Sequence, residues 1–519
     1  MLGASPALAA TAPRDAGSSV ASPTAPNASG SPAPDPSASS TTSGNSPLIK
    51  IPPASGTTAA QQAAMAAAAT QAKASGKPVP VTALTDEVTQ VIAQPDGQFT
   101  ADTNVTPVRA LHGGTWVPID IRLHRNPDGS LSPNSTAYGT VRFSGGGTAA
   151  LATTSSGGVS YTLSWPGRLV APRVSGSSAT YPDVLPGVDL QVQATDTGGF
   201  STVLIVKTAA AARNPQLKTL NLPTRIAGGQ ITRSRAKDGI TVSSGPRGPI
   251  LQSASPLMWD SNTTLAAVHP KAARAHLQLS PDPSNAGHAG IAARLAPVTT
   301  KATAGTLTLI PDPALLTGLH TVYPLYIDPT IDWTPTTAGT PDYVDREQGS
   351  PCTNTSFWDA APQLGNTSEH ALGIGRNLWS SCQGLMDPYF QWKLPAAIHG
   401  GIIQNATVKV TRNYSAACGS PASATLHWSG GINSGTSWAN PKPADLGHTV
   451  THSWPAQTGL NCTGGDIAEG FDLTYPVSSN TSATQITVEL EADGDPAGTN
   501  GVYWFGNIQP NPTLQITYN

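Results

Sequence analysis

Two glutamates stand two residues apart in the run VELEADGDPAGTNG, and further acidic residues follow them. On a β-strand, Glu489 and Glu491 would lie on one face with their Cα atoms about 7 Å apart. Glycosidases use two carboxylates about 5 to 9 Å apart, but the two flank the sugar from opposite sides, which a single strand does not provide. We therefore expect a solvated acidic face, with a catalytic pair as the alternative.

The loop after these glutamates contains oxygen ligands. Asp493, Asp495 and Asn500 could supply the hard oxygen shell that Ca²⁺ takes in proteins. The sequence predicts no cofactor, with a structural Ca²⁺ at these three residues as the alternative.

Two histidines lie four residues apart in the run HTVTH. The Thr-Val-Thr between His448 and His452 favours a strand, on which both side chains share a face about 13 Å apart, too far for one metal ion. We expect surface histidines here. The chain also lacks G-x-S-x-G, H-E-x-x-H, P-loop and G-x-G-x-x-G motifs, so we expect a protein that is not an enzyme.

Aromatic residues concentrate toward the C-terminus, where 18 of the 29 lie after residue 330. Exposed Trp and Tyr offer flat amphipathic area to the C–H faces of sugars. Trp358, Trp379 and Trp454 lie in loop-like surroundings rich in Gly, Ser and Asn, whereas Trp392 and Trp428 lie inside alternating strands and should be core. We predict ligand contact by the first three, with core or loop packing as the alternative.

Cysteine usage indicates an oxidising compartment. The four cysteines are widely spaced, which favours two disulfides over a zinc site: Cys352, Cys382, Cys418 and Cys462. Pairing in chain order is the simplest of the three possible connectivities. The Ala-Leu-Ala at residues 7–9 fits a signal-peptidase site, so residues 1–10 are interpreted as a signal-peptide remnant, with an ordinary Ala-rich end as the alternative. We expect an extracellular, secreted protein.

Charge is distributed unevenly along the chain. Residues 1–330 hold 22 Lys and Arg against 16 Asp and Glu, and residues 331–519 hold 6 against 15. Nucleic-acid affinity depends mostly on Lys and Arg, so a nucleic-acid partner is not expected. No run of about 18 apolar residues appears, so no transmembrane segment is expected.

Beyond the N-terminus the hydrophobic period is two, and Gly and Pro punctuate many short apolar runs, which indicates an all-β protein. Asp189 stands alone among apolar neighbours, but it alternates with Val188 and Leu190 after a Pro-Gly turn. We therefore expect it on the polar face of a strand rather than in an acid–base site. The expected parts are listed from the N-terminus: a disordered linker at 11–56, a short Ala-rich helix at 57–76, a β-rich region of one or two subdomains at 80–330, and a β-sandwich at 331–519.

The C-terminal stretch that begins SFWDAAPQLGN and closes with PTLQITYN resembles the DNRLRE-type modules of secreted actinobacterial proteins. Its YFQWKLP strand at Tyr389–Pro395, its strand at Ala406–Val408 and its T-S-W element at Thr436–Trp438 carry the resemblance. The resemblance implies a jelly-roll β-sandwich of the carbohydrate-binding kind. Such modules often neighbour LamG-like domains, and we expect none within this sequence.

These observations together predict a secreted, non-catalytic protein. Its expected partner is an extracellular polysaccharide or a cell-surface glycan, bound through the C-terminal β-sandwich. One alternative is a structural or adhesive surface protein without a glycan ligand, and another is a polysaccharide-degrading hydrolase. The glycan and the oligomeric state are left open.

Overall fold

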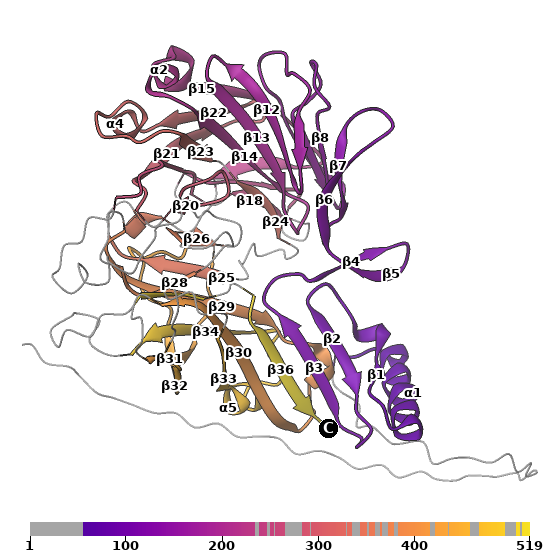
Figure 1. Cartoon of the computed structure of the whole chain (residues 1–519). Helices are drawn as coiled ribbons and strands as arrows, with labels where there is room; N and C mark the ends of the chain where they lie inside the picture. The colour runs from indigo at the N-terminus through magenta and orange to yellow at the C-terminus, as the bar shows by residue number, and fades with distance from the viewer. Residues whose placement is uncertain are drawn as a thin grey trace, which may run out of the picture. The chain divides into compact units, whose positions relative to one another are not determined.

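The computed structural model describes most of the chain after residue 55. The described residues are 56–233, 238–245, 250–253, 255–264, 283–290, 292–328, 330–334, 343–349, 352–355, 357–358, 364–365, 372–377, 382–415, 421–433, 435–456, 467–493, 505–508 and 511–519. The expected signal-peptide remnant at 1–10 and nearly all of the expected linker at 11–56 lie outside them. The described elements are mostly antiparallel strands, which confirms the all-β class (Figure 1).

The longest described helix is α1, Ala59–Ser75, where the sequence predicts one. Thr58 and Gln61 form a reciprocal capping box at its start, and Gly76 ends it with a φ of 65° that glycine adopts without strain. A face made almost entirely of alanine offers little apolar area to bury. Met65 and three alanines are nonetheless buried against the neighbouring strands, so packing stabilises a helix whose own polarity pattern is weak.

One large sheet, here called the terminal sheet, joins strands from both ends of the described chain. Its central strands run in the order β1 (Val79–Pro80), β2 (Thr89–Ala93), β3 (Phe99–Asn104), β36 (Thr513–Tyr518), β30 (Ile403–Ser415), β35 (Phe505–Ile508), β28 (Leu372–Asn377), β29 (Gly384–Lys393), β34 (Gln485–Ala492), β31 (Ala422–Ser429) and β32 (Asp445–Trp454). Three more strands pair beside them: β25 (Tyr343–Glu347), β26 (Phe357–Trp358) and β33 (Ile467–Asp472). Short helices attached to this part are η1 (Thr82–Leu84), η3 (Cys352–Asn354), η4 (Ala396–Ile398) and α5 (Thr474–Ser478).

A second, barrel-like sheet is formed by strands from the middle of the chain. Its strands are β6 (Asp120–Arg125), β7 (Leu131–Ser135), β8 (Thr140–Phe143), β9 (Ala152–Ser156), β10 (Val159–Leu163), β11 (Arg173–Ser175), β12 (Ser178–Leu185), β13 (Val188–Ala194), β14 (Phe200–Val206), β15 (Leu220–Ala227), β16 (Gln230–Arg233), β17 (Ile240–Ser243), β18 (Ile250–Ser253), β19 (Leu257–Trp259), β21 (Leu295–Ala302), β22 (Thr306–Pro311), β23 (Leu325–Asp328) and β24 (Ile331–Thr334). Short helices lie at α2 (Ala209–Ala212), η2 (Pro215–Lys218) and α4 (Pro313–Leu316). Two small sheets complete the set: β4 (Arg109–His112) with β5 (Thr115–Pro118), and β20 (Ala289–Gly290) parallel with β27 (Leu364–Gly365).

The division between the two sheets differs from the expected boundaries at 80 and 331. β3 pairs along its length with β36, from Phe99 opposite Tyr518 to Asn104 opposite Thr513 (Figure 1). β1 to β3 therefore belong to the terminal sheet, and their apolar side chains share its core. At the other boundary, β24 pairs with β18 of the barrel-like sheet.

Each sheet has its own apolar core. The barrel-like core includes every second residue of β13, whose side chains alternate between buried and partly exposed. Asp189 lies on the partly exposed side, 2.6 Å from Lys207 Nζ, and accepts a hydrogen bond from the Asp183 N–H. Asp189 is therefore a structural side chain on the polar face, as predicted. No helix of the described chain is long and apolar enough to cross a membrane.

Candidate functional site

The predicted aromatic contacts give a mixed outcome. Trp454 is fully buried, with its Nε1–H donating to the Val410 carbonyl and the Arg412 guanidinium 5.6 Å from its ring centre. Its predicted ligand contact is wrong, because Trp454 is the one buried residue of β32 and its ring packs against Phe471 in the core. Trp358 belongs to β26 by its backbone, but its side chain lies outside the described residues, as does all of Trp379.

An aromatic side chain that sequence reasoning missed is exposed instead. Tyr475 is 60% exposed, and it is the one aromatic among the large hydrophobic side chains that the described chain leaves exposed. Its ring lies 5.6 Å from the His448 ring, tilted by 33°, and 6.5 Å from the Trp428 ring, edge to face at 84°. We call Tyr475, Trp428 and His448 the aromatic platform.

Local structure explains why Tyr475 points outward. β33 ends at Asp472, whose carboxylate accepts a hydrogen bond from the Thr474 N–H at 2.8 Å and starts the turn of α5. In that turn Pro476 and Val477 are buried, which leaves Tyr475 on the opposite side. The run GFDLTYPV is thus divided between β33 and α5. The Asp-x-Thr turn signal and the proline could have indicated the break.

A second group of charged and titratable side chains lies on the polar face of β25, β29, β34 and β31. The other face of these strands is apolar and packs into the core through side chains such as Phe390, Val488 and Leu426. Because side chains alternate along a strand, Asp387, Tyr389, Glu489 and His427 share the opposite face. Tyr389 lies directly across from Glu489, and Glu489 directly across from His427. We call these four residues with Arg346, Lys442 and Glu491 the charged cluster.

Lys442 connects the two predicted glutamates. Its Nζ lies 3.0 Å from Glu489 Oε1 and 3.3 Å from Glu491 Oε2. His427 Nε2 lies 3.6 Å from Glu491 Oε2, and His427 Nδ1 lies 3.5 Å from Asp445 Oδ2. Glu489 and Glu491 thus share a face as predicted. The prediction that both glutamates are solvated is wrong for Glu489, which is only 2% exposed. Its carboxylate can be buried because the ammonium group of Lys442 compensates its charge.

The charged cluster also contains Arg346 and Asp387, both buried. Arg346 Nη1 lies 4.0 Å from Asp387 Oδ2 and 3.5 Å from Tyr389 Oη, and its Nε donates to the Ser437 carbonyl. Burial, and then the charges of Glu489 and Glu491, raise the pKa of Asp387 to about 7. Burial also raises the pKa of Tyr389, with Glu489 adding to the effect. Asp387 can therefore hold or release a proton near neutral pH.

The predicted Ca²⁺ ligands are described only in part. Asp493 accepts a hydrogen bond from Thr425 Oγ1, and its backbone N–H donates to the Ser423 carbonyl at 2.8 Å. Asp495 and Asn500 lie outside the described residues. Within the described ranges no group of three His, Cys, Asp or Glu side chains is placed to hold a metal ion. His448 and His452 lie on β32, a strand as predicted.

One of the predicted disulfides is described. Cys352 and Cys382 form a disulfide with their Cα atoms 5.2 Å apart, in a small apolar cluster with Trp259 and Met386. Cys418 and Cys462 lie outside the described residues.

Comparison with known proteins shows no family. No protein-family model matches the chain, and no curated protein matches its sequence. Among solved structures, the N-terminal domain of an adhesin of Streptococcus gordonii is 7% identical and covers 77% of this chain and 90% of its own, with a TM-score of 0.09. A TM-score this low supports no statement about fold or function.

Proposed function

We propose that the protein binds an extracellular polysaccharide or cell-surface glycan through the aromatic platform, without breaking a bond. The observation that carries the proposal is the exposed Tyr475 ring held against Trp428 and His448. A flat amphipathic ring stacks on the C–H face of a sugar, and its phenolic hydroxyl hydrogen-bonds to the sugar hydroxyls.

The platform is held in place before a ligand arrives. The buried Pro476 and Val477 anchor α5, and two aromatic contacts restrict the Tyr475 ring. A side chain that is already fixed loses little conformational entropy on binding, which favours affinity. His448 adds a polar ring whose Nε2 lies 3.4 Å from the Asp472 carbonyl.

An extracellular location is part of this proposal. The Cys352–Cys382 disulfide supports it, because disulfides persist mainly in oxidising compartments. A structural Ca²⁺ near Asp493 also stays a proposal, so binding should be measured with and without Ca²⁺.

The test is retention of the full chain on a panel of insoluble and soluble polysaccharides. Tyr475→Ala should weaken binding about fivefold or more, because it removes a stacked ring worth about 1 kcal/mol or more. Tyr475→Phe keeps the ring and should retain most of the affinity. Leu319→Ala is the matched control, since Leu319 is 99% exposed and outside the platform.

Two results would contradict the proposal. Unchanged retention of Tyr475→Ala would show that the platform is not the site. If no polysaccharide retains the wild-type chain with or without Ca²⁺, a structural or adhesive role without a glycan ligand becomes the better account.

A hydrolase is the second candidate, favoured by the coupled carboxyl groups of the charged cluster. Asp387, with a pKa of about 7 beside Glu489 and Glu491, has the protonation behaviour of a general acid. Release of reducing ends from a polysaccharide, abolished by Glu489→Gln with the fold intact, would establish this function and replace the non-catalytic proposal.

A further inference from the structure

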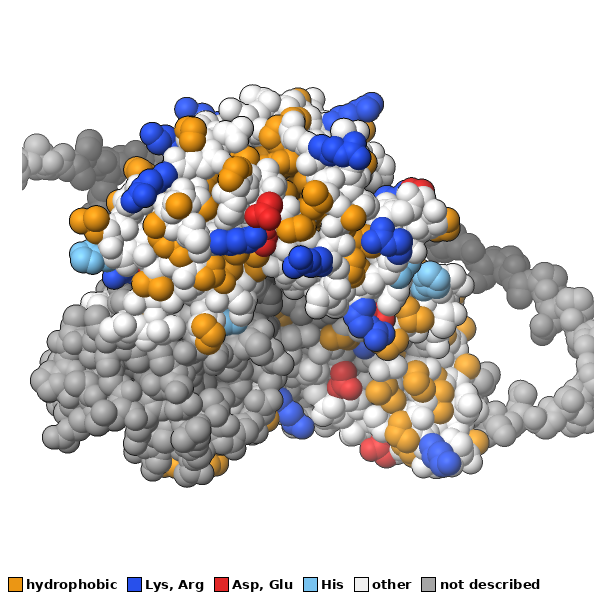
Figure 2. Space-filling model, turned by 45° about the horizontal axis from the view of Figure 1, so that its top comes forward, with side chains coloured by type: hydrophobic (Ala, Val, Ile, Leu, Met, Phe, Trp, Pro, Cys, Tyr) orange, Lys and Arg blue, Asp and Glu red, His pale blue; other side chains and the backbone are white. Residues whose placement is uncertain are grey.

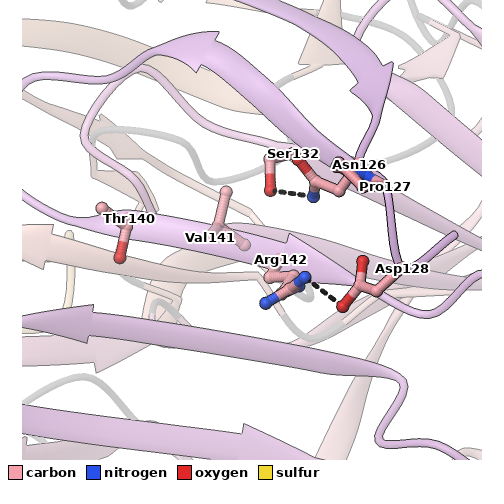
Figure 3. A pocket seen from close by; sticks show the side chains of 7 residues that line it. All are labelled: Asn126, Pro127, Asp128, Ser132, Thr140, Val141 and Arg142. Atoms are coloured by element: carbon pink, nitrogen blue, oxygen red, sulfur yellow. Dashed lines mark hydrogen bonds and ion pairs between the residues drawn. The ribbon is translucent and has the colours of Figure 1, made fainter. Parts of the chain in front are cut away.

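A hollow opens on the surface of the barrel-like sheet at the turn between β6 and β7. It has a volume of about 500 Å³, within the range of small-molecule sites. Seven residues line it: Asn126, Pro127, Asp128, Ser132, Thr140, Val141 and Arg142 (Figure 3). It lies apart in sequence from the aromatic platform, and the proposed function does not use it.

The run NPDG builds a rigid wall for this hollow. The Asn126 N–H donates to the Ser130 carbonyl at 2.8 Å, and the Gly129 N–H donates to the Asn126 carbonyl at 2.9 Å. Gly129 has a φ of 84°, which glycine adopts without strain. Asp128 Oδ1 accepts from both the N–H and the hydroxyl of Ser130, so the carboxylate is fixed beside β8.

Arg142 of β8 completes the polar lining. Its Nη2 forms an ion pair with Asp128 Oδ2 (Figure 3). Its Nε donates to Ser130 Oγ. Both charged side chains are about half exposed, at 52% for Arg142 and 59% for Asp128. Asn126 Nδ2 donates to the hydroxyls of Ser130 and Ser132, which orients its amide.

This arrangement matches the chemistry of a sugar. Arg142 uses two of its five N–H donors in these contacts, and carboxylate and amide oxygens accept more than one hydrogen bond. The hollow therefore presents donors and acceptors side by side, as vicinal hydroxyl groups require. Pro127 adds a small apolar surface for ring C–H groups, whereas the Val141 side chain is buried in the core of the barrel-like sheet.

Charge argues for a neutral ligand. Asp128 compensates Arg142, and hydrogen bonds from Ser130, then from Arg142, lower the pKa of Asp128, so the pair stays charged over the physiological range. On the face seen in Figure 2, Lys and Arg side chains are scattered over the barrel-like sheet and form no continuous track for a polyanion.

We propose that this hollow is a second saccharide site, which binds a unit of a neutral glycan through Asp128, Arg142 and Asn126. With the aromatic platform it would give the chain two glycan contacts, but the hollow stands on its own observations. A binding site on each sheet would raise avidity for a polymer without new contacts at either site.

The experiment measures binding of maltohexaose, cellohexaose, mannohexaose and hexagalacturonate to the full chain by titration calorimetry and saturation-transfer NMR. It is done in the Tyr475→Ala background, so that the hollow is tested without the platform. We expect residual binding of a neutral hexasaccharide in this background. Arg142→Gln should weaken that binding about fivefold or more, because it removes about one hydrogen bond to a charged group. Thr140→Val, which changes one hydroxyl at the rim, is the second variant.

Arg122→Gln is the matched control, because Arg122 forms a comparable exposed ion pair with Asp120 on β6, outside the residues that line the hollow. It should leave binding unchanged. The proposal is overturned if no hexasaccharide binds in the Tyr475→Ala background, or if neither Arg142→Gln nor Thr140→Val weakens binding. Tighter, salt-sensitive binding of hexagalacturonate would overturn the neutral class. A drop in affinity from the wild type to Tyr475→Ala that leaves residual binding reports on the platform and not on the hollow.

Discussion

Phe99→Ala tests whether the N-terminal strands are part of the terminal sheet. Phe99 is 2% exposed, and its ring stacks on Tyr518 with the ring centres 5.8 Å apart. Truncating a buried Phe to Ala costs about 3 to 5 kcal/mol, a large part of the usual 5 to 15 kcal/mol of a folded domain. We therefore expect a severe loss of stability in residues 372–518, far away in sequence.

Hydrogen exchange read by mass spectrometry localises this loss. Peptides from β36 and β30 should exchange about a hundredfold faster or more in Phe99→Ala, since each 1.4 kcal/mol is a factor of ten. Phe200→Ala is the matched control, because Phe200 is equally buried but belongs to the core of the barrel-like sheet. If Phe99→Ala leaves β36 protected, or acts mainly on peptides of the barrel-like sheet, then the pairing of β3 with β36 is refuted.

Two further predictions concern stability. Removing the disulfide with Cys352→Ala and Cys382→Ala, which are 30 residues apart in sequence, should cost about 3 to 4 kcal/mol and lower the urea midpoint, and an unchanged midpoint would argue against the bond. The pKa of Asp387 is raised from 3.8 to about 7. As the pH falls, the folded protein therefore binds a proton at Asp387 near pH 7, whereas the unfolded chain binds it only near pH 3.8. The free energy of unfolding should therefore rise as the pH falls through 7, and this rise should be complete near pH 4. In urea titrations from pH 8 to 5, Asp387→Asn should remove this part of the pH dependence. Burial also raises the pKa of Asp328 to about 7. Asp328 therefore contributes its own part of the pH dependence of stability, which Asp387→Asn should leave unchanged.

Local sequence patterns predict the strands themselves well. VDLQVQA becomes β13, where the alternation of apolar and polar residues reports which side of the strand is buried. QITVELEA becomes β34 as well, although both faces of that strand are buried over most of its length. The NPDG turn and the polar position of Asp189 follow from the same local chemistry. These features depend on a few neighbouring residues.

Features that depend on distant partners could not be predicted. Nothing within β3 specifies β36 as its partner, since any strand with a suitable edge satisfies the same pattern. Glu489 reads as an exposed acid until Lys442, from a different segment, is placed beside it. Trp454 is buried and Tyr475 is exposed because the packing of β33 and α5 decides their exposure, which single-residue surroundings do not reveal.

The pairing of β3 with β36 sets an order of events during synthesis. The hydrogen bond between the side chains of Thr513 and Asn104 joins residues 409 positions apart. At about 5 to 20 residues per second, the ribosome needs roughly 20 to 80 s to make the chain between them. The barrel-like sheet can fold in that interval and so shorten the loop that must close. The N-terminal strands wait for the last strand, so a chaperone has a defined period in which to shield Phe99 and its apolar neighbours.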